Sequence, residues 1–82
     1  MKYDYGKLKG RIVEKCGTRA AFSEMMGLSE KTISMKLNNK TAFKQPEIQK
    51  ALDVLDLTVE EIQTYFFTQK FKNFEQKKGV NR

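Results

Sequence analysis

Polar and charged side chains that could bind another molecule cluster in one short stretch, residues 30–36, with the sequence EKTISMK. Lysine donates hydrogen bonds, a carboxylate accepts them, and serine and threonine hydroxyls do both, so this stretch could pair with a patterned polar surface. The chemistry it offers is recognition. The side chains expected to point outward and reach a partner are Glu30, Lys31, Thr32, Ser34, Met35 and Lys36.

The composition argues against an enzyme or a metalloprotein. The 82-residue chain has no histidine and one cysteine, Cys16, which removes the commonest metal ligand and general base and leaves no internal disulfide. No Gly-rich phosphate loop and no paired carboxylates in a plausible cleft are visible in the sequence. We therefore expect no enzymatic activity, no metal, no cofactor and no small-molecule substrate. Cys16 is expected to be a small buried hydrophobe.

The charge is uneven along the chain. The net charge of +6 and the pI of about 9.6 favour an acidic partner, nucleic acid before others. Ten basic residues stand against four acidic ones over residues 1–44, one against five over 45–69, and five against one over 70–82. No apolar run approaches the ~20 residues of a transmembrane helix, and we expect no secretory signal. We therefore expect no membrane contact and a location in the cytoplasm.

The outward residues must be positioned by the segment 18–39, TRAAFSEMMGLSEKTISMKLNN, which predicts two short helices joined by a sharp turn. Gly27 suits the turn because it reaches positive φ without a Cβ clash. Thr18 and Ser29 are good N-caps for the two helices, so the second is expected to begin at Glu30. Apolar residues at helical spacing are expected to face inward: Ala21, Phe22, Met25, Met26, Leu28, Ile33 and Leu37.

This segment resembles the helix-turn-helix of the lambda-repressor-like superfamily, which includes phage repressors and Cro-like proteins. The longer run from Tyr3 to Ile48 is similar to small phage-encoded regulators of Gram-positive hosts. The resemblance implies an all-α, five-helix domain over residues 1–69, with the helix-turn-helix proper at 18–39 and a basic, Phe-containing extension at 70–82. It also implies that the second helix of the pair enters the major groove of double-stranded DNA.

Residue positions and the resemblance together assign DNA contacts. Lys31 could donate to guanine, Glu30 could accept from a cytosine amino group, and Thr32 and Ser34 could contact base edges or a thymine methyl. The full set of predicted base contacts is Glu30, Lys31, Thr32, Ser34 and Met35. The predicted contacts to the DNA backbone are Thr18, Arg19, Lys36, Asn38, Asn39, Lys40, Thr41 and Lys44.

The other helices are read from their apolar spacing and caps. Asp4 is expected to cap a first helix that runs to about Lys15, with Leu8, Ile12, Val13 and Cys16 on its apolar side. A fourth helix is expected from about Pro46 to Leu55. Thr58 and Glu61 form a capping box for a fifth, with Ile62, Tyr65 and Phe66 inward. Phe43, in the loop before the fourth helix, is expected to plug the core.

Phe67, Phe71 and Phe74 recur at helical spacing near the C-terminus. They could pack back on the domain, or they could join the fifth helix in binding a second copy or a phage repressor. A third alternative is that this segment is a loose basic tail that binds DNA. Two functions follow from these features. The first is a Cro-like, sequence-specific DNA-binding transcriptional regulator of a phage operator. The alternative is an antirepressor or modulator that binds a phage repressor protein. An antitoxin of a toxin pair is a weaker third reading.

Overall fold

The computed structural model describes residues 2–69, and within them every regular element is helical apart from one isolated antiparallel bridge between Tyr3 and Gln69. The prediction of an all-α fold with five helices is confirmed. The predicted extension, residues 70–82, lies outside the described residues. The elements are α1 (Gly6–Cys16), α2 (Arg19–Met26), α3 (Glu30–Leu37), α4 (Gln45–Leu55), the 3-10 turn η1 (Val59–Glu61) and α5 (Ile62–Phe66).

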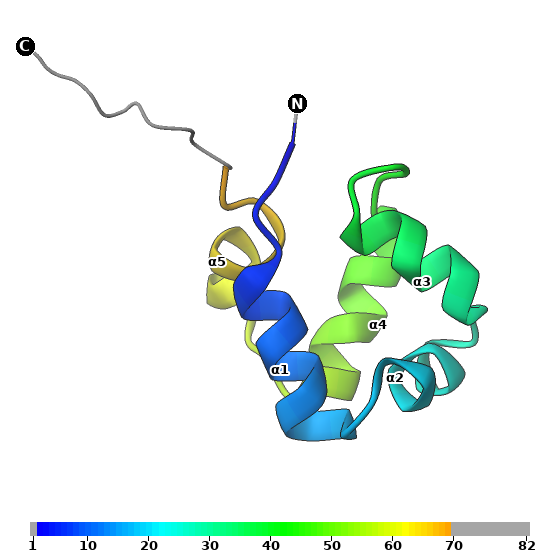
Figure 1. Cartoon of the computed structure of the whole chain (residues 1–82). Coiled ribbons are helices and arrows are strands. Elements are labelled where there is room, and N and C mark those ends of the chain that lie inside the picture. Colours follow the sequence, from blue (N-terminus) through cyan, green and yellow to red (C-terminus); the bar gives the residue numbers. More distant parts are fainter. Residues whose placement is uncertain (1, 70–82) are drawn as a thin grey trace, which may run out of the picture.

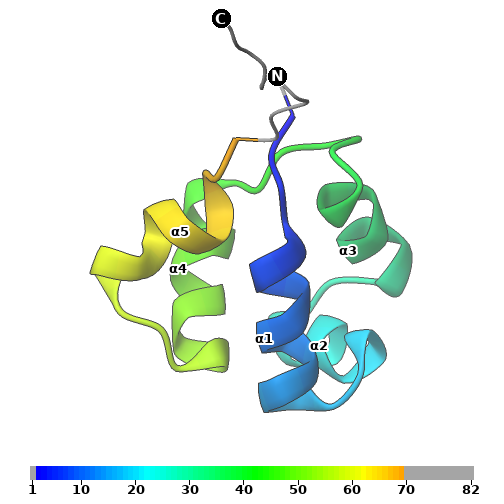
Figure 2. The same cartoon turned by 60° about the vertical axis from the view of Figure 1, so that its left-hand side comes forward.

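Helices α1 and α4 run through the middle of the fold, with the α2 and α3 pair on one side and α5 on the other (Figures 1 and 2). The N-terminal segment lies beside the end of α5, where the Asp4 amide donates to the Thr68 carbonyl at 2.7 Å. With α1 and α4 between them, the α2–α3 pair and α5 lie on opposite sides of the domain (Figures 1 and 2).

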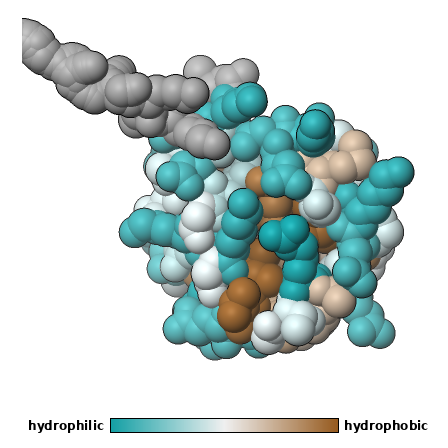
Figure 3. All heavy atoms as spheres, viewed as in Figure 1, coloured by the Kyte–Doolittle hydropathy of each residue, from teal (hydrophilic) through white to brown (hydrophobic). Residues whose placement is uncertain are grey.

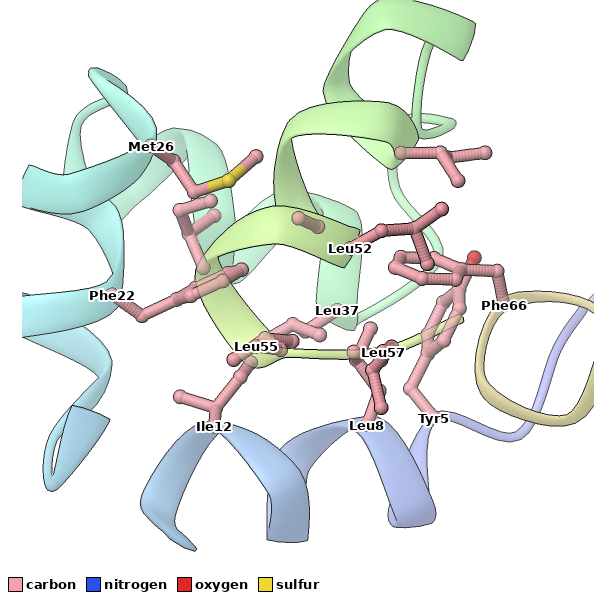
Figure 4. Close-up of a cluster of buried hydrophobic side chains, with 13 residues drawn as sticks. Tyr5, Leu8, Ile12, Phe22, Met26, Leu37, Leu52, Leu55, Leu57 and Phe66 are labelled. Atoms are coloured by element: carbon pink, nitrogen blue, oxygen red, sulfur yellow. The ribbon is translucent and has the colours of Figure 1, made fainter. Parts of the chain in front are cut away.

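The core is a single cluster to which all five helices contribute (Figure 4). Side chains four residues apart lie on one face of a helix, which is why Leu8 and Ile12 of α1 both point inward. Each helix buries one such stripe, and together the stripes form the core. Its fully buried members are Leu8, Ile12, Phe22, Ile33, Ala51, Leu55 and Phe66.

Several residues expected to face the core are exposed instead. Val13 follows Ile12 by one residue, about 100° around the helix, and it is 62% exposed. On α2, Phe22 and Met26 fill the inner face, so Met25 is turned out and is 52% exposed. Cys16 is half-buried, with its Sγ 3.7 Å from Met25 Sδ, and this partial burial raises the pKa of its thiol.

Helix ends follow the predicted caps in most places. The Thr18 and Ser29 hydroxyls accept from the amides of Ala21 and Thr32, at 3.0 and 3.1 Å. The predicted cap at Asp4 is wrong by one residue, because α1 begins at Gly6 with Tyr5 as its N-cap. Asp4 Oδ1 still accepts from the Gly6 amide at 2.9 Å.

The capping box before α5 is also present, since Glu61 Oε1 accepts from the Thr58 amide at 2.9 Å. The Glu61 amide bonds back to the Thr58 carbonyl at 3.0 Å, however, which is an i to i+3 bond. The chain therefore makes a 3-10 turn first, and α5 begins at Ile62.

Arg11 ties α1 to the end of α4. Its Nε donates to the Leu55 carbonyl at 2.9 Å and its Nη2 to the Asp56 carbonyl at 3.0 Å. Asp56 ends the helix with φ of 55°, and the last carbonyls of a helix lack partners within it. A guanidinium at this position donates to two of these acceptors, and its positive charge interacts favourably with the negative end of the helix dipole.

Candidate functional site

The α2–α3 pair is held by a tight turn at Gly27, whose φ of 75° lies in the left-handed region. The Leu28 amide donates to the Ser23 carbonyl at 3.0 Å, which closes α2 and starts the turn. Ile33 and Leu37 are buried at 0% and 2% exposure, as the sequence predicts. These two anchors fix which side of α3 faces outward.

We call the outward side of α3 the α3 face; it comprises Glu30, Lys31, Ser34, Met35 and Asn38. Lys31 and Met35 lie one turn apart and are both exposed, as is Glu30. Met35 is 36% exposed, a moderate apolar area among polar neighbours. The α3 face thus offers one carboxylate, one ammonium group and one thioether side chain to a partner.

The predicted hydroxyl contacts are less available than the sequence suggests. Thr32 and Ser34 are both half-buried. The Ser29 hydroxyl donates to Thr32 Oγ1 at 2.9 Å, and Asn38 Nδ2 donates to Ser34 Oγ at 3.3 Å. Part of the hydrogen-bonding capacity of these hydroxyls is therefore used within the protein. Glu30, Lys31 and Met35 are the members of the predicted base-contact set that stand exposed.

The prediction that Lys36 contacts a DNA phosphate is wrong, because the structure places this side chain in the interior. Its side chain is 5% exposed, and its Nζ lies 2.9 Å from Glu47 Oε1 and 2.9 Å from the Ala42 carbonyl. The same ammonium group lies 5.9 Å from the centre of the Phe43 ring. Facing α4, Lys36 joins the end of α3 to the start of α4 and is unavailable to a partner.

The carboxylate that pairs with Lys36 also holds the start of α4. Glu47 Oε1 accepts from the Lys44 amide at 2.8 Å. Burial raises the pKa of Glu47, but hydrogen bonds from the Lys44 amide and from Lys36, with the charges of both lysines, outweigh it, so the net pKa is lowered. The group is therefore ionised at neutral pH.

The loop after α3 is fixed at Asn39, which has a φ of 62°. Its side chain accepts from the Tyr3 amide at 2.8 Å and donates to the Tyr3 carbonyl at 2.9 Å. Asn39 is half-buried and engaged in this way, so its availability to a DNA backbone is reduced. The other residues predicted to contact the backbone are exposed: Thr18, Arg19, Asn38, Lys40, Thr41 and Lys44.

Phe43 anchors that loop to the core, as the sequence predicts. Its ring makes edge-to-face contacts with Tyr5 and Phe66, with centroids 5.5 and 5.2 Å apart. Tyr3 makes a similar contact with Phe67 at 5.5 Å. The predicted inward set of the fifth helix is present too, with Phe66 buried and Ile62 and Tyr65 half-buried against the core. The apolar side of α5 therefore serves largely for packing.

Sequence reasoning missed a groove between α4 and α5. It has a volume of about 390 Å³, and its lining residues, which define the α4–α5 groove, are Phe43, Gln45, Ile48, Gln49, Ile62 and Phe67. The signal available in the sequence was one isoleucine on each helix, Ile48 and Ile62, each followed by a glutamine. Figure 3 shows the face seen in Figure 1, where hydrophilic side chains flank a narrow hydrophobic strip.

Within residues 2–69, no helix is long and apolar enough to cross a bilayer. The same residues hold no group of three or more His, Cys, Asp or Glu side chains that could bind a metal ion.

The fold and surface are those of a small all-α domain built around a pair of short helices. Residues 1–69 match the family model described as Protein of unknown function (DUF739), and the chain belongs to that family. No match is found among curated proteins.

One similar solved structure is the solution structure of the modulator of repression (MOR) of the temperate bacteriophage TP901-1 from Lactococcus lactis. The two chains are 51% identical, with a TM-score of 0.74, and the match covers 88% of this chain and 97% of that one.

This similarity corrects the first functional prediction. The prediction of a sequence-specific, Cro-like DNA-binding regulator is overturned by the likeness to a modulator of repression. This likeness favours the alternative prediction, a modulator that binds a repressor protein. The resemblance to lambda-repressor-like proteins stays a prediction. So do the DNA contacts assigned to individual residues, except at Lys36, which the structure places in the interior.

Proposed function

We propose that this chain is a phage modulator of repression that acts by binding the repressor protein of the same phage. The observation that carries the proposal is 51% identity to the modulator of bacteriophage TP901-1 over nearly the whole of that chain. The activity is binding alone, without catalysis or a cofactor, in the bacterial cytoplasm where a phage repressor works.

The chemistry of the α3 face supports a protein partner. The exposed Glu30 carboxylate would be repelled by DNA phosphates, whereas it can pair with a cationic side chain of a protein. Lys36, which would add positive charge for DNA, is neutralised internally by Glu47. Met35 supplies a flexible apolar side chain of the kind enriched in protein interfaces. We therefore place the repressor contact on the α3 face.

The fifth helix is a weaker candidate for that contact than the sequence suggested. Phe66 is 1% exposed, and Ile62, Tyr65 and Phe67 pack against the core. The apolar surface left on this side is that of Ile62 and Phe67 in the α4–α5 groove, which faces away from α3. Phe71 and Phe74, the other predicted contacts to a partner, lie outside the described residues.

The proposal is tested with the purified full chain and the purified repressor of the same phage. Isothermal titration calorimetry should give a saturable complex with a Kd of about 1 µM or tighter. A repressor from an unrelated phage is the control for specificity. A second titration, of the full chain into operator DNA without repressor, should give no binding at physiological salt.

Two results would remove the proposal. One is an absence of heat and of co-elution with the cognate repressor at tens of micromolar of each protein. The other is a complex that forms equally well with the unrelated repressor.

A further inference from the structure

The α4–α5 groove is an apolar surface that the folded domain leaves uncovered. Phe43, Ile62 and Phe67 are each half-buried, and Ile48 at the base of the groove is 8% exposed. A second hollow of about 230 Å³ adjoins it and shares Phe43, Ile48 and Phe67 as lining residues. Contiguous apolar concavities of this kind bind apolar side chains, because burial removes both surfaces from water.

The last described residues of the chain lie beside this groove. Phe67 lines the groove, and two residues later Gln69 pairs with Tyr3 in the antiparallel bridge. The bond from the Asp4 amide to the Thr68 carbonyl fixes the same point. Residues 70–82 follow directly. At about 3.3–3.6 Å per residue, a fully extended chain would reach at most ~7 Å from Gln69 at position 71 and ~18 Å at position 74.

The two segments have opposite charge. Residues 45–69, which supply most of the groove, carry five acidic residues and one basic residue. Residues 70–82 carry five basic residues and one acidic residue. Glu60 and Glu61 immediately precede Ile62, the residue of α5 that lines the groove. Electrostatic attraction therefore favours the last segment over an acidic competitor at this surface.

We propose that the segment 70–82 of the same chain docks on the α4–α5 groove, with Phe71 and Phe74 as its apolar anchors and its lysines facing the exposed acidic residues of 45–69, which are Asp53, Asp56 and Glu60. An intramolecular occupant has the advantage of an effective concentration in the millimolar range, set by the short connection through Gln69. A surface covered in this way is protected from non-specific association. The inference does not depend on the proposed function.

The test is nuclear magnetic resonance of the full chain labelled at isoleucine δ1 methyl groups. The chain has four isoleucines: Ile48 and Ile62 line the groove, while Ile12 and Ile33 are buried in the core on α1 and α3. We expect nuclear Overhauser effects from the Phe71 and Phe74 rings to the methyl groups of Ile48 and Ile62. The double variant Phe71→Ser/Phe74→Ser should lose these effects and shift both groove methyl signals, leaving Ile12 and Ile33 unchanged.

A matched control replaces polar residues of the same segment, as Asn73→Ser/Gln76→Ser, and should leave all four methyl signals in place. Samples diluted tenfold should give the same spectrum, because the contact is within one chain. Groove methyl signals that do not respond to Phe71→Ser/Phe74→Ser would overturn the proposal. So would effects seen only between differently labelled chains in a mixed sample, which would identify a second copy as the occupant.

Discussion

Lys36 Nζ lies 2.9 Å from Glu47 Oε1 although the two side chains are only 5% and 18% exposed. Each charge also has a backbone partner, the Ala42 carbonyl for Lys36 and the Lys44 amide for Glu47. The pair connects the last turn of α3 to the first turn of α4. It therefore adds a polar contact between α3 and α4 to the apolar anchoring of α3 by Ile33 and Leu37.

Replacing one member of this pair should be far more costly than replacing both. In Lys36→Met the Glu47 carboxylate loses its ion pair in a mostly buried site, and we expect a loss of about 3–5 kcal/mol in the free energy of unfolding. The double variant Lys36→Met/Glu47→Met should lose less, since no unpaired charge remains. Urea denaturation followed by circular dichroism measures both. A single variant as stable as the wild type would show that the pair is energetically unimportant.

The pH dependence of stability should carry the signature of Glu47. Its pKa in the folded chain is lowered from the ordinary value of 4.5. A carboxyl group with a depressed folded pKa adds stability that is complete above its unfolded pKa and is lost as the pH falls through the folded value.

We therefore expect the stability difference between the wild type and Glu47→Gln to be greatest at neutral pH and to shrink as the pH falls below about 4.5. Urea titrations at a series of pH values give this difference. A difference that stays constant down to about pH 3 would mean that the Glu47 carboxylate is not stabilised by folding.

Two glycines should respond to alanine in opposite directions. Gly10 lies inside α1 with nothing within 4 Å of an added Cβ, so Gly10→Ala should stabilise the protein by about 0.5–1 kcal/mol. Gly27 has a φ of 75°, where a side chain is strained, so Gly27→Ala should destabilise by about 1–3 kcal/mol. Thermal denaturation of the two variants compares them directly. Equal shifts of Tm in the same direction would contradict the difference in backbone conformation between Gly10 and Gly27.

The α3 face should decide affinity for the repressor. Met35→Asp places a charge at the apolar centre of this face, and we expect at least a tenfold weaker complex, about 1.4 kcal/mol or more. Val59→Asp is the matched control, because Val59 is 71% exposed on η1, away from α3. Calorimetry with the cognate repressor gives both values. If Val59→Asp weakened binding and Met35→Asp did not, the contact surface would lie on the α4–α5 side.

The sequence was enough to predict the helices and most of their caps, because the spacing of apolar residues and capping chemistry act over a few neighbouring positions. Thr18, Gly27 and Ser29 illustrate this, and so does the inward direction of Ile33 and Leu37. It also predicted that Phe43 packs into the core. What it misjudged was which side chains near the edge of a stripe are covered, as at Val13, Met25 and Cys16.

The partners of Lys36, Arg11 and Asn39 follow only from how the helices pack, because these partners are distant in the chain. Lys36 reads as an outward lysine on α3 until Glu47 of α4 is placed beside it. Arg11 finds its acceptors 44 and 45 residues away, and Asn39 finds Tyr3 36 residues away. Periodicity cannot reveal such pairings, since they arise only when the helices pack. The α4–α5 groove is another feature of packing, formed where two helices and a loop meet.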